Sequence, residues 1–262
     1  MSSNYHLSKG QCGVLISMPH NGQCIPDEIA KTMTEHGLKV PDTDWYIDKL
    51  YDFAQQLGVS IISPEYSRYV IDLNRDTSGV NLYPGANSTE LCPTTAFDLS
   101  PLYLDGQLPD EQEIVRRIEL YWQPYHQEIN DTLASMKKQY GKVVLLDAHS
   151  ILSQVPRFFA GQLPDFNFGN VDGVSCSEVL MTQVAQLDFS PYSSVVNGRF
   201  KGGYITRAFG KPHEDMHALQ LELSQKTYMD EPSDHYNEGK AEQVKQKLFN
   251  LVQCLVEFSQ KK

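Results

Sequence analysis

Two short apolar runs that each lead into a histidine constrain the fold of this chain more than any other feature of its sequence. Residues 13–18 have the composition of a buried strand and run into a polar turn that contains His20, and residues 142–146 run in the same way towards His149. Amphipathic helical patterns separate such runs. Strands that alternate with helices predict an α/β domain whose ligand site lies beyond the carboxyl ends of the strands, so we expect both histidines at one edge of a central sheet.

The rest of the pattern also indicates a layered α/β fold. A length of 262 residues at 40% hydrophobic content supports one large core, so we expect a single domain over residues 1–262. Residues 76–109 are rich in proline, glycine and asparagine, and form either a binding lid or an ordinary surface loop. We predict helices over residues 42–57, 110–140 (bent at Pro124), 176–187, 204–209 and 238–258, and further strands over 59–62, 69–73, 193–197 and 217–223.

The charge balance limits the partners that this chain can bind. Lysine and arginine total 22 against 33 aspartate and glutamate residues, a formal net charge of −11, and no segment gathers the basic residues into a stripe. We therefore expect neither nucleic acid nor an anionic membrane as a partner, and no obligate protein partner. A small anionic substrate is compatible with this charge, because a few arginines in a cleft can reverse the local potential.

The N-terminal segment and the cysteines predict a cytoplasmic protein. Residues 1–10 are polar and lack the layout of a signal peptide, and no apolar run approaches the roughly 20 residues that span a bilayer. The five cysteines are odd in number and widely scattered, without the paired spacing of a zinc or redox motif. We expect reduced, mostly buried thiols.

The histidines at the strand ends are candidate metal ligands. A catalytic zinc ion needs about three protein ligands and an open position for water. His20, His149 and one of the acids Asp44 or Asp48, which lie four residues apart and face the same way in a helix, can supply this set. Asp147, two residues before His149 in an extended chain, either accepts the second imidazole N–H or caps a turn.

A carboxylate and several arginines complete the candidate chemistry. Glu222 lies on the polar side of an otherwise hydrophobic strand, where it either pairs with a cation or serves as a general base. Paired hydrogen bonds from arginine are the usual means of binding an acidic substrate. The residues alone indicate a metallohydrolase with an anionic substrate, and the candidate arginines are Arg68, Arg75, Arg157, Arg199 and Arg207.

Six segments, in this order along the chain, resemble the N-formylglutamate amidohydrolase (deformylase) family. They are SMPHNG at 17–22, YSRYVIDLNR at 66–75, LCPTT at 91–95, DAHS at 147–150, NGRFKGGYITR at 197–207 and QLELSQKTYMDE at 220–231. The resemblance implies a fold similar to that of zinc carboxypeptidases and aspartoacylase-type deacylases, a three-layer α/β/α arrangement with a mixed central sheet and one zinc ion at the strand ends. It also implies that His20, Asp44 and His149 are the metal ligands and that Glu222 is the general base.

The same resemblance implies a substrate and a reaction. Asn74 and Arg75 would bind one substrate carboxylate, and Arg199, Lys201 and Arg207 are the candidates for a second. The implied activity is hydrolysis of N-formyl-L-glutamate to formate and L-glutamate, the last step of a histidine-degradation route, by a zinc-activated water that attacks the formyl carbon. Alternatives are a deacylase of another N-acyl amino acid, a metallocarboxypeptidase, and a non-catalytic anion-binding protein.

Two positions depart from the expected pattern. The related deacylases take two metal ligands from a His-x-x-Glu motif, whereas Gln23 occupies the last position of that motif after His20. The acidic ligand must come from elsewhere; we choose Asp44 because the family resemblance includes residues 43–45, and Asp48 stays the alternative. Tyr46 occupies a position where the resemblance leads us to expect histidine.

Overall fold

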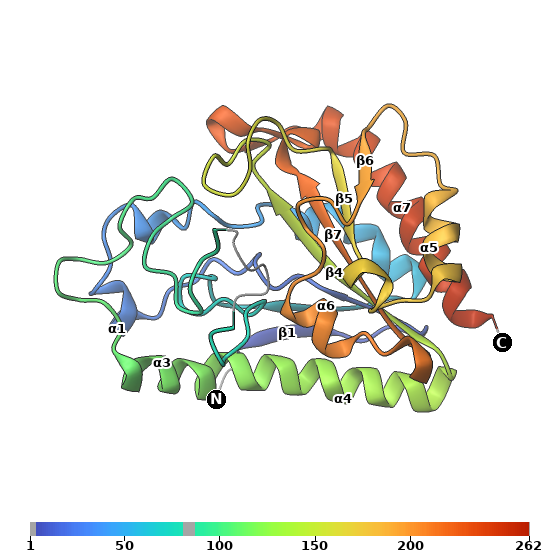
Figure 1. The fold of residues 1–262 in the computed structure, drawn as a ribbon, viewed down its shortest axis with the longest axis horizontal. Coiled ribbons are helices and arrows are strands. Elements are labelled where there is room, and N and C mark those ends of the chain that lie inside the picture. Colours follow the sequence, from blue (N-terminus) through green and yellow to red (C-terminus); the bar gives the residue numbers. More distant parts are fainter. Residues whose placement is uncertain (1–3, 81–86, 262) are drawn as a thin grey trace.

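A seven-stranded mixed sheet forms the centre of the computed structural model, which describes residues 4–80 and 87–261 (Figure 1). The strand order is β1-β3-β2-β4-β7-β5-β6; β3, β2, β4 and β7 run parallel, while β1 and β5 are antiparallel to their neighbours β3 and β7. The strands are β1 (Tyr5–Ser8), β2 (Val14–Ser17), β3 (Ser60–Pro64), β4 (Val143–Ile151), β5 (Phe166–Gly169), β6 (Ser194–Val196) and β7 (Met216–Ser224), and β8 (Met229–Asp230) pairs separately with β9 (His235–Tyr236).

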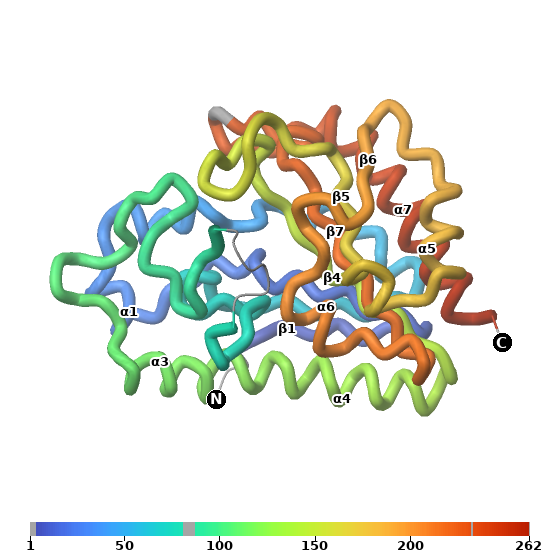
Figure 2. The backbone as a smooth tube through the Cα atoms, viewed as in Figure 1, coloured from blue at the N-terminus to red at the C-terminus, as the bar shows by residue number. Residues whose placement is uncertain are grey.

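Helices cover both faces of the sheet. The long α4 (Gln123–Tyr140) lies along one face, while α5 (Glu178–Ala185) and α7 (Glu238–Gln260) cover the other (Figures 1 and 2). The other α-helices are α1 (Asp27–Ala30), α2 (Ile47–Leu50), α3 (Glu111–Arg117) and α6 (Tyr204–Phe209). The π-helical turn η3 (Ile118–Trp122) joins α3 to α4, and the 3-10 turns are η1 (Gly37–Lys39), η2 (Asp52–Leu57), η4 (Val171–Gly173), η5 (Pro212–Glu214), η6 (Gln225–Thr227) and η7 (Glu231–Ser233).

Alternate residues of the central strands supply the two apolar cores. In β4, Val144 and Leu146 pack in the core that also contains α7, while Val143 and Leu145 pack in the core on the α4 side. All nine residues of β4 are buried, because a central parallel strand has helices on both faces. The expected α/β fold with a mixed central sheet and helical layers is confirmed.

Most expected elements are present, but the predicted strand over residues 69–73 is wrong. This segment forms turns outside the sheet, although Tyr69, Val70 and Ile71 are buried in the core on the α4 side. A short apolar run indicates burial and does not by itself distinguish a strand from a loop packed over a core. Strand β4 also extends beyond its predicted end, so His149 lies within the strand.

The predicted continuous helix over residues 42–57 is also wrong. Tyr46 adopts a left-handed conformation with φ of 59°, which interrupts the helix, so only α2 and the 3-10 turn η2 form. Asp44 therefore lies in the turn before α2 and is buried, whereas Asp48 lies in α2 and is exposed. The two acids do not share the helix face that their spacing predicts.

The helical segment that ends at Tyr140 agrees with its prediction. It begins with Asp110, whose side chain caps Glu113 N, and Pro124 lies in the first turn of α4, directly after the π-helical turn. All five cysteines are free. In the part of the chain that the structure describes, no helix combines the length and apolar character that a membrane span requires.

Candidate active site

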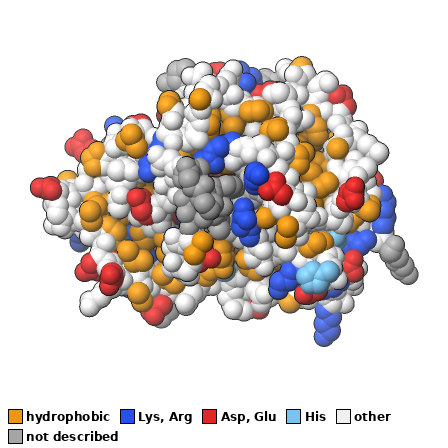
Figure 3. Space-filling model, viewed as in Figure 1, with side chains coloured by type: hydrophobic (Ala, Val, Ile, Leu, Met, Phe, Trp, Pro, Cys, Tyr) orange, Lys and Arg blue, Asp and Glu red, His pale blue; other side chains and the backbone are white. Residues whose placement is uncertain are grey.

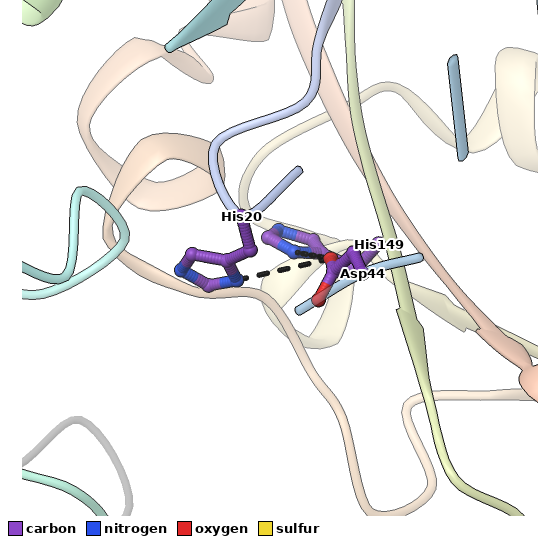
Figure 4. Close-up of side chains that lie close together, drawn as sticks. All are labelled: His20, Asp44 and His149. Carbon is purple, nitrogen blue, oxygen red and sulfur yellow. Dashed lines mark hydrogen bonds and ion pairs between the residues drawn. The ribbon is translucent and has the colours of Figure 1, made fainter. Parts of the chain in front are cut away.

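His20, Asp44 and His149 converge at the carboxyl edge of the parallel strands, as Figure 4 shows. The three potential ligand atoms lie within 4.8 Å of one another, and all three residues are buried. Asp44 Oδ2 is 3.2 Å from His149 Nδ1 and 3.8 Å from His20 Nδ1. Two imidazole nitrogens and one carboxylate oxygen are a donor set that fits a zinc ion.

Pairing within the sheet brings these residues together. His20 follows β2 and His149 lies in the adjacent parallel strand β4. Asp44 is held next to them by two backbone contacts: Asp44 N donates to His20 O at 3.0 Å, and Asp44 Oδ2 accepts from Ser150 N at 3.1 Å. Residues 20, 44 and 149 therefore meet because of long-range packing.

A buried carboxylate lies against the outer nitrogen of each histidine. His20 Nε2 lies 2.7 Å from Asp72 Oδ1, and His149 Nε2 lies 3.1 Å from Asp147 Oδ1. Such carboxylates orient metal-binding imidazoles, and here both rings turn Nδ1 towards Asp44. The second contact agrees with one of the two roles expected of Asp147, whereas no role was expected of Asp72, although a carboxylate inside an apolar run was an available signal.

The surroundings of Asp72 and Glu222 shift the pKa values of these two acids in opposite directions. Burial alone would raise the pKa of Asp72, but the nearby charges of His20 and Arg68 hold that pKa well below its ordinary value. Glu222 lies directly opposite His149 in the pairing of β7 with β4. Burial raises the pKa of Glu222 to about 8.

Glu222 and the histidines line a pocket that also contains three arginines, Arg68, Arg75 and Arg199. Arg75 donates to Thr89 Oγ1 at 3.2 Å, and Arg199 Nε donates to Phe158 O at 2.8 Å. Figure 3 shows lysine and arginine side chains gathered near the middle of one face, with most acidic side chains towards its edge. The remaining wall of the pocket is partly apolar and includes Phe97, Ile151, Phe158 and Phe200.

Asn74 reaches the pocket, but its amide is engaged with the protein. Asn74 Oδ1 accepts from Ile205 N at 2.8 Å, and Nδ2 lies 2.9 Å from His149 Nε2 and 3.2 Å from Asp147 Oδ2. A Cβ atom at Gly203 would lie 2.3 Å from Asn74 Nδ2, so the glycine allows this close approach. The structure therefore indicates that Asn74 holds Asp147, which lies beside His149, and the start of α6; its predicted contact with substrate stays a prediction.

The other predicted cations lie in different surroundings. Lys201 Nζ lies 3.0 Å from Asp172 Oδ2, Arg207 Nε donates to Gly202 O at 3.0 Å, and neither lines the pocket. Arg157 binds the backbone oxygen of Ala96 at 2.7 Å. Among the candidate arginines, Arg68, Arg75 and Arg199 are those that the fold brings to the pocket.

The two departures from the expected motif lie outside the cluster. Gln23 is exposed, so the structure does not offer it as a replacement ligand. Tyr46 donates to Asp234 O at 3.2 Å and its ring lies 5.3 Å from that of Tyr236, away from the pocket lining. Among the described residues, no hydrogen bond or ion pair joins the side chain of Gln23 or Tyr46 to the cluster of His20, Asp44 and His149.

The fold and the cluster define an α/β protein with a candidate metal centre beside a basic pocket. Its fold is that of the N-formylglutamate amidohydrolase from Ralstonia eutropha JMP134, with a TM-score of 0.82, 24% identity and 97% of each chain covered. Residues 12–229 match the model of the N-formylglutamate amidohydrolase family. The chain belongs to this family.

Two relatives are similar over almost their whole length. The chain is 44% identical to an N-formylglutamate deformylase of Pseudomonas putida over 251 residues, which cover 95% of this chain and 94% of that protein. It is 43% identical to an N-formylglutamate deformylase of Pseudomonas aeruginosa, with 95% of each chain covered. The family expected from the six sequence segments is thus confirmed.

Proposed function

We propose that this chain hydrolyses N-formyl-L-glutamate to formate and L-glutamate, as the last step of a histidine-degradation route. The names of the two Pseudomonas relatives support this substrate. The observation that carries the proposal is the position of Glu222 beside the cluster of His20, Asp44 and His149, in a pocket that contains three arginines. A buried acid next to a metal-type donor set, in a pocket lined by three arginines, suits hydrolysis of an anionic amide.

The three clustered residues would hold one zinc ion through His20 Nδ1, Asp44 Oδ2 and His149 Nδ1. Bound there, the ion would supply Lewis acidity and lower the pKa of a water molecule. Two histidines and one carboxylate are a ligand set found in catalytic zinc sites. This chemistry supports a zinc-dependent amidohydrolase.

Glu222 is the general base and acid in this proposal. A group that first accepts and later returns a proton works best when its pKa lies near the operating pH, and burial raises the pKa of Glu222 to about 8. The carboxylate would take the proton of the attacking water and deliver it to the leaving amine of L-glutamate. Its place opposite His149 supports this assignment.

The three arginines of the pocket would bind different groups of the substrate. N-formyl-L-glutamate carries two carboxylates, which call for at least two cationic partners. We assign Arg75 to one carboxylate and Arg199 to the other, because both line the pocket. Arg68 NH1 lies 4.0 Å from Asp44 Oδ1, so it is the cation best placed to stabilise the oxygen on which negative charge develops.

A formate-release assay combined with metal analysis tests this function. We expect His149→Ala to lose the metal, and Glu222→Gln to keep it while turnover falls roughly 10²- to 10⁴-fold. Asp48→Asn is the matched control, because it removes an exposed carboxylate that lies near the cluster in sequence only, and it should retain metal and turnover. A zinc-loaded wild type that releases no formate would instead favour a non-catalytic anion-binding protein.

Acyl specificity is tested with three glutamate derivatives. We expect the zinc-loaded protein to turn over N-formyl-L-glutamate faster than the N-acetyl and N-succinyl compounds. Faster turnover of a longer acyl group would identify the chain as a deacylase of another N-acyl amino acid. Release of a C-terminal residue from a peptide would indicate a carboxypeptidase.

A further inference from the structure

Asp72 lies between the candidate metal centre and the arginines of the pocket, and it is fully buried. Its two oxygens face different partners. Oδ1 accepts from His20 Nε2 at 2.7 Å and from Asn74 N at 2.9 Å, whereas Oδ2 accepts from Arg68 NH2 at 2.7 Å and lies 3.8 Å from Arg75 Nε. One carboxylate therefore contacts a candidate ligand and two arginines that line the pocket.

The contact with His20 determines which ring nitrogen is available to a metal. An ionised carboxylate only accepts hydrogen bonds, so His20 Nε2 carries the proton. His20 Nδ1 then keeps its lone pair and faces Asp44 Oδ2, at 3.8 Å. Rotating the ring to present Nε2 instead would leave the buried Asp72 oxygen without this donor, which is costly.

The contacts with the arginines hold two guanidinium groups at the wall of the pocket. Arg68 binds Asp72 through NH2, and its Nε is buried without a hydrogen-bond partner in the described structure. Arg75 Nε likewise lacks a hydrogen bond there and lies near Asp72 Oδ2. Guanidinium groups that line a pocket are suited to an incoming carboxylate or oxyanion, and both arginines line this one.

We propose that Asp72 is a positioning residue that couples the metal centre to the substrate anchors: Oδ1 orients His20 for metal binding, and Oδ2 holds Arg68 and Arg75 at the pocket. The expected effect of Asp72 on zinc affinity follows from its contact with His20 and does not depend on the identity of the substrate. The effect on substrate rests on the proposed function.

Asp72 also accepts a hydrogen bond from Asn74 N, as an aspartate that forms a turn does. If this structural role were its only one, its substitution would have the same effect as that of another aspartate that supports the loop. Asp42 provides the matched comparison, because it supports the same segment through Tyr69 OH at 2.6 Å and Phe97 N at 2.8 Å. The described hydrogen bonds and ion pairs of Asp42 include neither His20 nor the pocket arginines.

The experiment compares Asp72→Asn, Asp42→Asn and wild type. Zinc affinity is measured by competition with a chelator, and KM and kcat for N-formyl-L-glutamate are measured at saturating zinc. We expect Asp72→Asn to lose about 10- to 100-fold in zinc affinity, to raise KM by about ten-fold because Arg75 binds a substrate carboxylate, and to lower kcat by about ten-fold because Arg68 stabilises the developing charge. Asp42→Asn should keep zinc affinity and KM close to the wild-type values even if its melting temperature falls.

Two results would overturn the proposal. One is wild-type zinc affinity and KM in Asp72→Asn, and the other is an equal loss in Asp42→Asn. If Asp72→Asn does not fold, long-range ¹H–¹⁵N spectra of the zinc-loaded wild type decide the matter: we expect His20 to bind through Nδ1 with a proton on Nε2, and binding through Nε2 would refute the orienting role. A wild type that binds zinc but releases no formate would refute the proposed function alone, because the zinc measurements remain valid.

Discussion

At the level of single residues, the site depends on buried acids that have several defined partners. Asp147 lies beside His149 and also accepts from Asn74 Nδ2 at 3.2 Å and Thr206 Oγ1 at 3.1 Å. Asp72 contacts His20 and Arg68 in a comparable way. Removing one partner of a buried ion pair leaves a charge without compensation, so these contacts are more sensitive to substitution than surface ion pairs.

Substitution of Gly203 tests whether the Asn74 amide positions His149 through Asp147. A methyl group at position 203 would lie 2.3 Å from Asn74 Nδ2. We expect Gly203→Ala to displace the amide and to lower both zinc affinity and turnover by roughly ten-fold or more, measured by chelator competition and formate release. Gly239→Ala is the control, because its nearest added contact is 3.6 Å and causes no clash. Wild-type zinc affinity in Gly203→Ala would show that the amide does not orient the imidazole.

At the level of elements, α3 supports the loop that carries Asp72. Arg117, in the last turn of α3, is almost fully buried and donates to Val70 O at 3.0 Å and to Tyr103 OH at 2.8 Å. Glu113, one turn earlier, accepts from Arg117 Nε at 2.7 Å. The helix thereby fixes the backbone of a segment that forms no strand. Asp72 lies two residues after Val70 in this segment and contacts His20.

This arrangement predicts a pH dependence of stability. Hydrogen bonds from Arg116 and Arg117 lower the pKa of Glu113 from 4.5 to about 2. A carboxyl whose pKa is lower in the folded state stabilises the fold above its unfolded pKa, and this contribution is lost as the pH falls from about 4.5 towards 2. We expect Glu113→Gln to lower the melting temperature at pH 7 and to make it less dependent on pH across that interval.

Melting curves of the wild type and two variants at pH 7, 4 and 3 provide the check. Glu111→Gln is the matched control, because Glu111 is an exposed acid in the same helix and its loss should leave the curves unchanged. The same fall in melting temperature between pH 7 and pH 3 in Glu113→Gln as in the wild type would contradict the role of the Glu113–Arg117 pair.

At the level of the whole molecule, the candidate metal centre joins segments far apart in the chain. His20 follows β2, Asp44 precedes α2 and His149 lies in β4. A ligand that binds only the folded state stabilises it by mass action, by about 2.7 kcal/mol at a hundred times its Kd. Only the folded chain brings these three residues together, so the folded state is the one that binds the metal ion.

Removal of zinc should therefore lower the melting temperature of the whole protein. We expect chelator-treated protein to unfold several degrees below the zinc-loaded protein, and added zinc to restore the higher value, as measured by calorimetry. His149→Ala should show no such shift with zinc. A shift of equal size in this variant would place the stabilising ion elsewhere.

Local patterns determined the elements that carry the site. The apolar runs before His20 and His149 predict the two adjacent strands, and the alternation around Glu222 predicts its polar face on β7. These patterns succeed because side-chain periodicity follows directly from backbone geometry. The short strands β1 and β5 were missed, since four residues contain too little of a pattern to distinguish them from a loop.

Only the tertiary structure decided which polar residues meet. Sequence spacing alone treats Asp44 and Asp48 as equivalent, and the left-handed turn at Tyr46 buries one and exposes the other. Sequence spacing likewise does not reveal that Asp72 lies against His20. Nor does it show that Arg68 lines the pocket while Lys201 pairs with Asp172. The physical reason is that a side chain's partners depend on contacts between distant segments, which no local periodicity encodes.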